Sequence, residues 1–194
     1  MASGLAPRVV VASRPTEWDQ LLARHATAAQ ASFFLETRSL DDSAVRERDL
    51  SQDDALSLVS SVIPAAWRRA HIDRSGFAGF LFQPEDIVVA VGQDGLVPNV
   101  AKYLDGQPVI GVNPDPERYE GALMRFSAES IGEVLEAVSA GQATTEDRTM
   151  AEASLDDGRR LLALNEVFVG HRSHQSARYA LKVSETAYPV RSGP

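Results

Sequence analysis

The chain has 194 residues, of which 44% are hydrophobic and 24% charged, so it is long enough to bury a sizeable core. Its formal net charge is -8, from 27 acidic and 19 basic side chains, which argues against a general nucleic-acid-binding protein. The absence of cysteine excludes disulfides, thiolate zinc sites and a cysteine nucleophile, and no apolar run is long enough to span a bilayer. We therefore expect a cytoplasmic protein with no nucleic-acid or membrane partner.

The N-terminal part of the chain predicts a strand followed by a helix. Residues 9–12 form a continuous apolar run, as expected of a strand that is buried on both faces. Thr16 is placed to cap a helix whose apolar face carries Trp18 and Leu21. Residues 31–35 fit either a helix or a strand, because so short an apolar run has no decisive period.

A polar segment follows, and then a second helix. Residues 38–48 are polar and charged and predict a loop or an exposed segment. Helical periodicity begins at Ser51 and ends before Pro64, which cannot continue a helix. Residues 69–73 then predict a short strand, followed by a small helical stretch around Phe77.

The stretch IVVAVGQDGLV, at 87–97, has two interpretations. Asp-Gly between two apolar runs is a hairpin signal, but a glycine-flanked turn after a buried strand also precedes helices in α/β proteins. Apolar residues recur at helical spacing after Gly95, and Pro98 suits a first helical turn but not a paired strand. Because another apolar run follows at 109–112, we predict a strand–turn–helix–strand unit in a parallel sheet rather than a hairpin.

The chain then changes from α/β to β-rich in character. Ser130 and Glu133 fit a capping box for a helix that ends at Gly141. Beyond it, residues 156–158 (Asp-Asp-Gly) predict a hairpin turn, and residues 168–183 are strand-like in pieces. We expect a boundary near Gly141, and the roughly fifty residues after it would struggle to close a core alone.

The turn at 92–95 carries the strongest chemical signal. Gly92 and Gly95 allow the backbone to approach an anion closely, and the amides at the start of the next helix are expected to point toward it. Asp94 is expected at the carboxyl edge of the sheet, where it suits proton abstraction from a hydroxyl nucleophile or the positioning of Mg²⁺. The alternative is that Asp94 and Gly95 only make a tight turn between a strand and a helix.

Several other side chains have weaker signals. Asp115 and Glu117 lie in a proline-rich loop and fit either Mg²⁺ binding or a plain surface loop. His171 and His174 are three residues apart, which in a strand puts them on opposite faces, so a solvated loop is the preferred interpretation. The arginines Arg118, Arg125, Arg172 and Arg178 could bind anions, but lone arginines are usually surface residues. Ser173 and Ser176 do not form a convincing hydrolase site, because the sequence has no nucleophile elbow.

Three stretches in order carry a resemblance to a known family. Residues 92–95 (GQDG) look like the Gly-Gly-Asp-Gly loop of ATP-dependent NAD kinases, a loop shared with diacylglycerol kinases and, more distantly, phosphofructokinases. Residues 108–118 (PVIGVNPDPER) are similar to the strand and loop that follow it, particularly in the mitochondrial-type branch. Residues 162–169 (LALNEVFV) look like the family's ALNEV strand. The resemblance covers roughly residues 9–183 and favours NAD kinases over lipid kinases.

The resemblance implies a fold, a reaction and roles for residues. It implies a Rossmann-like α/β domain in 1–142, followed by the beginning of an all-β sandwich in 143–194, with active sites often completed across a subunit interface of a homo-oligomer. The implied reaction is Mg²⁺-dependent transfer of the ATP γ-phosphate to the 2′-hydroxyl of the adenosine ribose of NAD, with Asp94 as the general base. The residues implied in nucleotide binding are Gly92, Gln93, Gly95, Lys102, Asn113, Asn165 and Glu166, the last two toward NAD.

The sequence departs from the family pattern at three places. Gln93 stands where the family has a glycine, and Leu96 stands where it has Thr or Asn. The Gly/Thr-rich segment expected later in the sandwich is not found, so we expect residues 143–194 to form a truncated, partial NAD-binding domain. The alternatives are a non-catalytic nucleotide-binding or oligomerisation module, and a lipid or sugar kinase with the same loop. The phosphate donor, ATP or polyphosphate, is left open.

Overall fold

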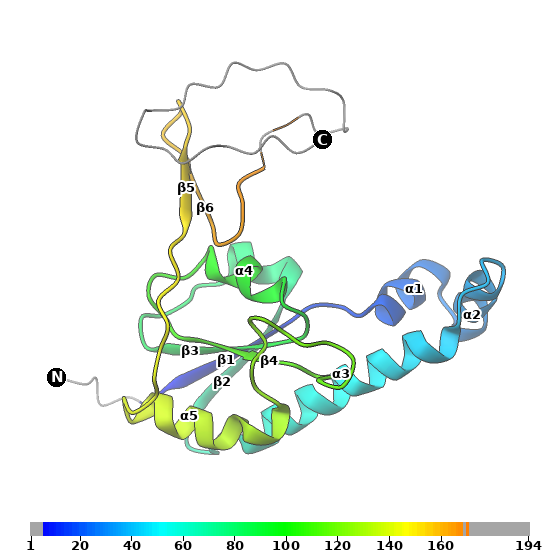
Figure 1. Cartoon of the computed structure of the whole chain (residues 1–194), viewed down its shortest axis with the longest axis horizontal. Coiled ribbons are helices and arrows are strands. Elements are labelled where there is room, and N and C mark those ends of the chain that lie inside the picture. Colours follow the sequence, from blue (N-terminus) through cyan, green and yellow to red (C-terminus); the bar gives the residue numbers. More distant parts are fainter. Residues whose placement is uncertain (1–5, 169, 171–194) are drawn as a thin grey trace.

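The computed structural model describes residues 6–168 and 170, which form a parallel four-stranded sheet covered by helices and a separate β-hairpin (Figure 1). The strands are β1 (Arg8–Ser13), β2 (Arg68–Asp73), β3 (Asp86–Val91), β4 (Val109–Val112), β5 (Ala151–Ser154) and β6 (Arg160–Ala163). The helices are α1 (Glu17–His25), α2 (Ala28–Glu36), α3 (Asp42–Val62), α4 (Leu96–Ala101) and α5 (Ile131–Ser139), with 3-10 turns η1 (Arg74–Gly79) and η2 (Ala128–Ser130). The α/β fold class and the Rossmann-like sheet expected from the sequence are confirmed.

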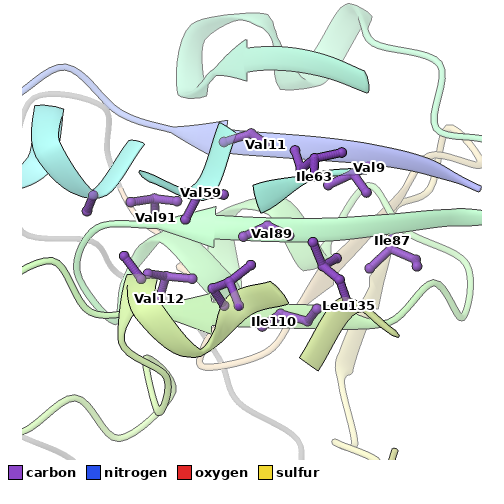
Figure 2. Close-up of a cluster of buried hydrophobic side chains, with 13 residues drawn as sticks. Val9, Val11, Val59, Ile63, Ile87, Val89, Val91, Ile110, Val112 and Leu135 are labelled. Atoms are coloured by element: carbon purple, nitrogen blue, oxygen red, sulfur yellow. The ribbon is translucent and has the colours of Figure 1, made fainter. Parts of the chain in front are cut away.

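The order of strands in the main sheet is β2-β1-β3-β4, and every neighbouring pair is parallel. Alternate residues of β1 and β3 point to opposite faces. Val9, Val11 and Val89 pack with α3 and α5 on one face, as Figure 2 shows. Val10 and Val88 pack with α4 and η1 on the other. The continuous apolar runs therefore reflect strands that are buried on both faces, as predicted.

The structure confirms the predicted strand–turn–helix–strand unit. β3 leads through the turn at 92–95 into α4, which lies over the sheet, and the chain returns in β4 parallel to β3. α4 is only six residues long, so its amphipathic face is short, but Leu96 and Val100 are almost fully buried on it. The predicted strand at 69–73 is confirmed as β2, and the predicted cap at Thr16 is confirmed at the start of α1.

Residues 38–48 were predicted as a loop or exposed segment, and most of their side chains are exposed, but from Asp42 onward the backbone is helical and not a loop. α3 begins at Asp42, with Asp41 as its N-cap, and runs without interruption for 21 residues. Its first turns expose charged side chains, but Val45 is buried in a small cluster with Trp18 and Leu35 from α1 and α2. One buried apolar residue in these turns is too few to produce a helical period in the sequence. The ambiguous segment 31–35 is helical, within α2.

The capping box predicted at Ser130 is also absent. Ser130 has helical dihedral angles as the last residue of η2, and its hydroxyl donates to the carbonyl oxygen of Ser127 instead of capping α5. Gly141 follows the helix with a φ of 66°, as expected at a helix C-terminus.

The predicted hairpin around residues 156–158 is confirmed as the antiparallel pair β5 and β6, with arms shorter than predicted. Leu164, after β6, packs against the α4 side of the core, so the hairpin stands above α4 (Figure 1). Most of the predicted strand pieces in 168–183 lie outside the described residues. Among the described helices, none combines the length and the apolar composition needed to cross a membrane.

Candidate functional site

The strand order creates a crevice at the carboxyl ends of β1 and β3. β1 has β2 on one side and β3 on the other, so the connections that leave β1 and β3 run in opposite directions. Open α/β sheets bind ligands at such a switch point. A cleft of about 1030 Å³ lies there, lined by residues directly after β1, the turn at 92–95, part of α3 and the loop 113–125. The turn singled out from the sequence therefore lines this cleft.

The two glycines of the turn have different roles. Gly92 has a φ of 150°, a backbone conformation that favours glycine. An added Cβ would make only ordinary contacts, 3.5 Å from Leu96 Cδ2 and 3.7 Å from Gln52 Oε1. Gly95 has an ordinary helical φ of -62°, and nothing lies within 4 Å of an added Cβ. The fold therefore requires glycine at 92 but leaves open space at 95, on the wall of the cleft.

Gly95→Ala is expected to leave the fold unchanged and to weaken the binding of a ligand that lies against the turn. The added methyl group meets no protein atom, and alanine adopts the φ of this position without strain, so the melting temperature should move by no more than about 3 °C. A ligand whose phosphates lie against the turn would meet that methyl group. If this ligand is a nucleotide, as the family resemblance implies, calorimetric titration with ATP should show an increase in Kd of about fivefold or more. Unchanged affinity would mean that the ligand does not approach Gly95.

The carboxylate of Asp94 joins the turn to the loop across the cleft. Its Oδ1 accepts hydrogen bonds from the backbone N–H groups of Leu123 (2.8 Å) and Met124 (3.1 Å), and Oδ2 accepts from Ala122 (2.9 Å). Partial burial raises the pKa of Asp94, but the three backbone hydrogen bonds together outweigh it and hold the pKa below its ordinary value. Asp94 is therefore ionised at neutral pH, and among the described residues its Oδ2 accepts one hydrogen bond and keeps a second lone pair for a ligand.

The amides at the start of α4 do not have the role expected of them. The N–H of Leu96 donates to the carbonyl oxygen of Gln93 at 2.8 Å, and the N–H of Val97 donates to that of Asp94 at 3.2 Å. Leu96 is only 1% exposed and packs in the core. The departure from Thr or Asn at position 96 therefore changes core packing and does not change the wall of the cleft.

The loop that Asp94 contacts is itself held by Asn113. The Asn113 Nδ2 donates to the Tyr119 carbonyl oxygen at 2.6 Å, and its Oδ1 accepts from the Asp115 N–H at 3.0 Å. Gly121 turns with a φ of 67°, and an added Cβ would lie 2.7 Å from the Met124 carbonyl oxygen. Asn113 thus lines the cleft while its amide is engaged in shaping the loop, and its predicted contact with a nucleotide stays a prediction.

Four arginines line the cleft, and they differ in their partners. Three of them form ion pairs: Arg48 with Glu17 at 2.8 Å, Arg118 with Glu47 at 2.9 Å and Arg125 with Glu146 at 3.3 Å. Arg14, directly after β1, instead donates from Nη2 to the amide oxygen of Gln93 at 2.6 Å. Within the described part of the chain, Arg14 has no carboxylate within ion-pair distance.

Other predicted site residues lie away from the cleft. Lys102 follows the last turn of α4, with its Nζ 5.6 Å from the Tyr103 ring centroid. Asn165 and Glu166 follow β6 and are exposed, and neither lines the cleft. Asp115 does line it, but its carboxylate lies 3.4 Å from the Arg118 guanidinium. The structure does not describe six candidates: His171, Arg172, Ser173, His174, Ser176 and Arg178.

Arg14 and Gln52 are among the cleft residues that the sequence analysis did not single out. Arg14 was passed over, although a basic residue directly after a buried strand that precedes a helix is a usable signal for the carboxyl edge of a sheet. Gln52, on α3, is only 8% exposed and donates to the Arg14 carbonyl oxygen at 2.7 Å. No local pattern marks Gln52, because its partner is 38 residues away.

No protein-family model matches the chain. Part of it is similar to curated NAD kinases: it is 33% identical over 87 residues to that of Chlorobium phaeobacteroides (strain BS1), 34% to that of Chlorobium luteolum and 31% to that of Chlorobaculum tepidum. The matched segments cover 43% to 45% of this chain. They span only about 30% of the length of each relative. This partial similarity supports a relation to the NAD kinase family and to phosphotransferases.

Proposed function

We propose that this chain transfers the γ-phosphate of ATP to the 2′-hydroxyl of the adenosine ribose of NAD, giving NADP. The observation that carries the proposal is the place of Asp94, which lies beside Gly92 and Gly95 in the cleft at the switch point of a parallel sheet. The similarity to NAD kinases supports the same reaction class.

In the proposed reaction, Asp94 removes the proton from the 2′-hydroxyl. The ribose oxygen then bonds to the γ-phosphorus, the bond from that phosphorus to the β-phosphate oxygen breaks, and ADP leaves. The lowered pKa of Asp94 keeps its carboxylate in the basic form at neutral pH, and the free lone pair of Oδ2 is available to accept the hydroxyl proton. The loop at 122–124 holds the carboxylate in one orientation through the three amide bonds.

The described residues do not form a set of protein ligands for Mg²⁺. No group of three or more histidine or carboxylate side chains in this part of the chain is arranged to hold a metal ion. Asp115, which with Glu117 fits either Mg²⁺ binding or a plain surface loop in the sequence, is paired with Arg118. Mg²⁺ is commonly bound mainly through substrate phosphates, which would then supply most of its ligands in this cleft.

A second function is favoured by one specific observation. Asn165 and Glu166, which the family resemblance assigns to NAD, lie outside the cleft that contains Asp94. This separation supports the alternative of a nucleotide-binding module without catalytic activity. The two functions differ in whether NAD binds and whether NADP forms.

Asn165→Ala with Glu166→Ala tests the proposed function. If the two side chains contact NAD, the loss of two hydrogen bonds should raise the Kd for NAD by about tenfold with little change in melting temperature. Binding is measured by calorimetric titration, and NADP formation from ATP, Mg²⁺ and NAD is measured in parallel. Glu136→Ala, an exposed change on α5, is the control. Binding of ATP without any NADP formation by the parent chain would support the non-catalytic alternative and contradict the kinase proposal.

A further inference from the structure

We propose that Arg14 binds the phosphate groups of the nucleotide in the cleft and that Gln93 positions its guanidinium. The inference deepens the proposed function, because it rests on the cleft taking a nucleotide. It gives a phosphate role to Arg14, which the family resemblance does not single out. It also gives a specific part to Gln93, which the resemblance places among the nucleotide-binding residues although the family has a glycine there.

The backbone and the side chain of Arg14 are both held. Its carbonyl oxygen accepts from Nε2 of the buried Gln52 at 2.7 Å, which anchors the end of β1 to α3. Its guanidinium reaches from the end of β1 to the turn after β3, where Nη2 donates to Gln93 Oε1 at 2.6 Å. The cation therefore bridges the two strand ends that define the switch point.

The charge of Arg14 is not cancelled within the described part of the chain. The other cleft arginines are each paired with a carboxylate, as described above. The neutral amide of Gln93 accepts one of the five guanidinium N–H groups and leaves the positive charge and four donors for a ligand. Such a planar fork suits a phosphate, to which it donates in pairs.

This contact also gives a reason for the side chain at position 93. Gln93 is exposed and belongs to none of the three hydrophobic clusters of the described residues. Its described side-chain contact is the hydrogen bond from Arg14. If Gln93 affects phosphate binding only by positioning Arg14, replacing Gln93 should have no effect once Arg14 is removed. A double-mutant cycle measures this.

The test uses the full 194-residue chain and calorimetric titration with three probes: ATP, inorganic tripolyphosphate and adenosine. Arg14→Ala should raise the Kd for ATP and for tripolyphosphate by about tenfold to a hundredfold and leave adenosine binding unchanged. Arg14→Lys should restore only part of the affinity, because an ammonium group lacks the planar fork. Gln93→Ala should raise both phosphate Kd values severalfold, and should have no further effect when Arg14 is already alanine.

Arg48→Ala is the matched control, because it removes one positive charge from the same cleft at a residue already paired with Glu17. Melting temperatures of all variants confirm folding, and Arg14→Lys keeps the test informative if Arg14→Ala is unstable. Equal losses for Arg14→Ala and Arg48→Ala, or no phosphate binding by the parent, would overturn the inference. Two outcomes separate this inference from the proposed kinase activity, because tripolyphosphate binding needs neither NAD nor turnover. If Arg14→Ala loses tripolyphosphate binding but the parent forms no NADP, the inference is supported and the kinase activity is refuted. If the parent forms NADP and Arg14→Ala has an unchanged KM for ATP, the kinase activity is supported and the inference is refuted.

Discussion

If this chain forms NADP as proposed, Asp94→Asn is expected to lower the kcat of that reaction by about a hundredfold to ten-thousandfold, the usual contribution of general-base catalysis. The asparagine amide is nearly the same size but cannot accept the ribose proton. Nucleotide affinity should change little or improve, because a negative charge near the phosphates is removed. The measurement is steady-state NADP formation by the parent chain and the variant. Turnover by Asp94→Asn at the parental rate would refute the assignment of Asp94 as the base.

The same substitution also probes the second role of Asp94, which is to hold the loop at 122–124. An asparagine side chain has one oxygen acceptor in place of two, so at least one backbone N–H loses its partner or faces the amide NH₂ group. We expect the free energy of unfolding to fall by about 1 to 3 kcal/mol. A purely structural Asp94 would show this loss with little specific effect on kcat.

The stability effect has a defined pH dependence. The pKa of Asp94 is lowered in the folded chain, so the ionised carboxylate contributes to the free energy of unfolding at pH values above the unfolded pKa, about 3.9. This contribution is lost as the pH falls through the folded pKa. The difference in unfolding free energy between parent and Asp94→Asn should therefore be constant near neutral pH and shrink below pH about 4. Urea unfolding at several pH values checks this. A difference that grows toward acid pH would contradict the hydrogen-bonding account.

Gly111→Ala is expected to be the most damaging small substitution in the sheet. An added Cβ on β4 would lie 2.0 Å from the carbonyl oxygen of Leu123, which is backbone and has no flexible end to move away. The loop would have to leave β4, and its contacts with Asp94 would be lost. We expect a loss of about 3 kcal/mol or more, or a fall of about 6 to 12 °C in melting temperature.

Gly79→Ala is the control for this experiment, because nothing lies within 4 Å of its added Cβ and its φ is not positive. It should shift the melting temperature by no more than about 3 °C. If Gly111→Ala were as stable as Gly79→Ala, the close packing of the loop against β4 would be refuted. Because residues of that loop also line the cleft, Gly111→Ala should reduce the binding of the proposed nucleotide as well as stability.

Local sequence patterns were enough to predict the elements whose burial is repetitive. β1, β3 and β4 are continuous apolar runs because both of their faces are covered, and this gives a signal at every residue. The turn at 92–95 was predicted to precede a helix because Pro98 fits a first helical turn. The first half of α3 was missed because Val45 is its main apolar anchor, and Val45 is buried only by partners on α1 and α2.

The sequence alone thus determined the parallel α/β sheet and placed Asp94 in the turn at its carboxyl edge, because strand burial and turn chemistry are local properties. The tertiary structure decided what that turn contacts. Asp94 accepts hydrogen bonds from backbone amides that lie 28 to 30 residues further along the sequence, and Arg14 donates one to Gln93, 79 residues further along. Hydrogen bonds of this kind depend on which strand ends lie side by side, and that order is set by packing of the whole sheet rather than by any local pattern.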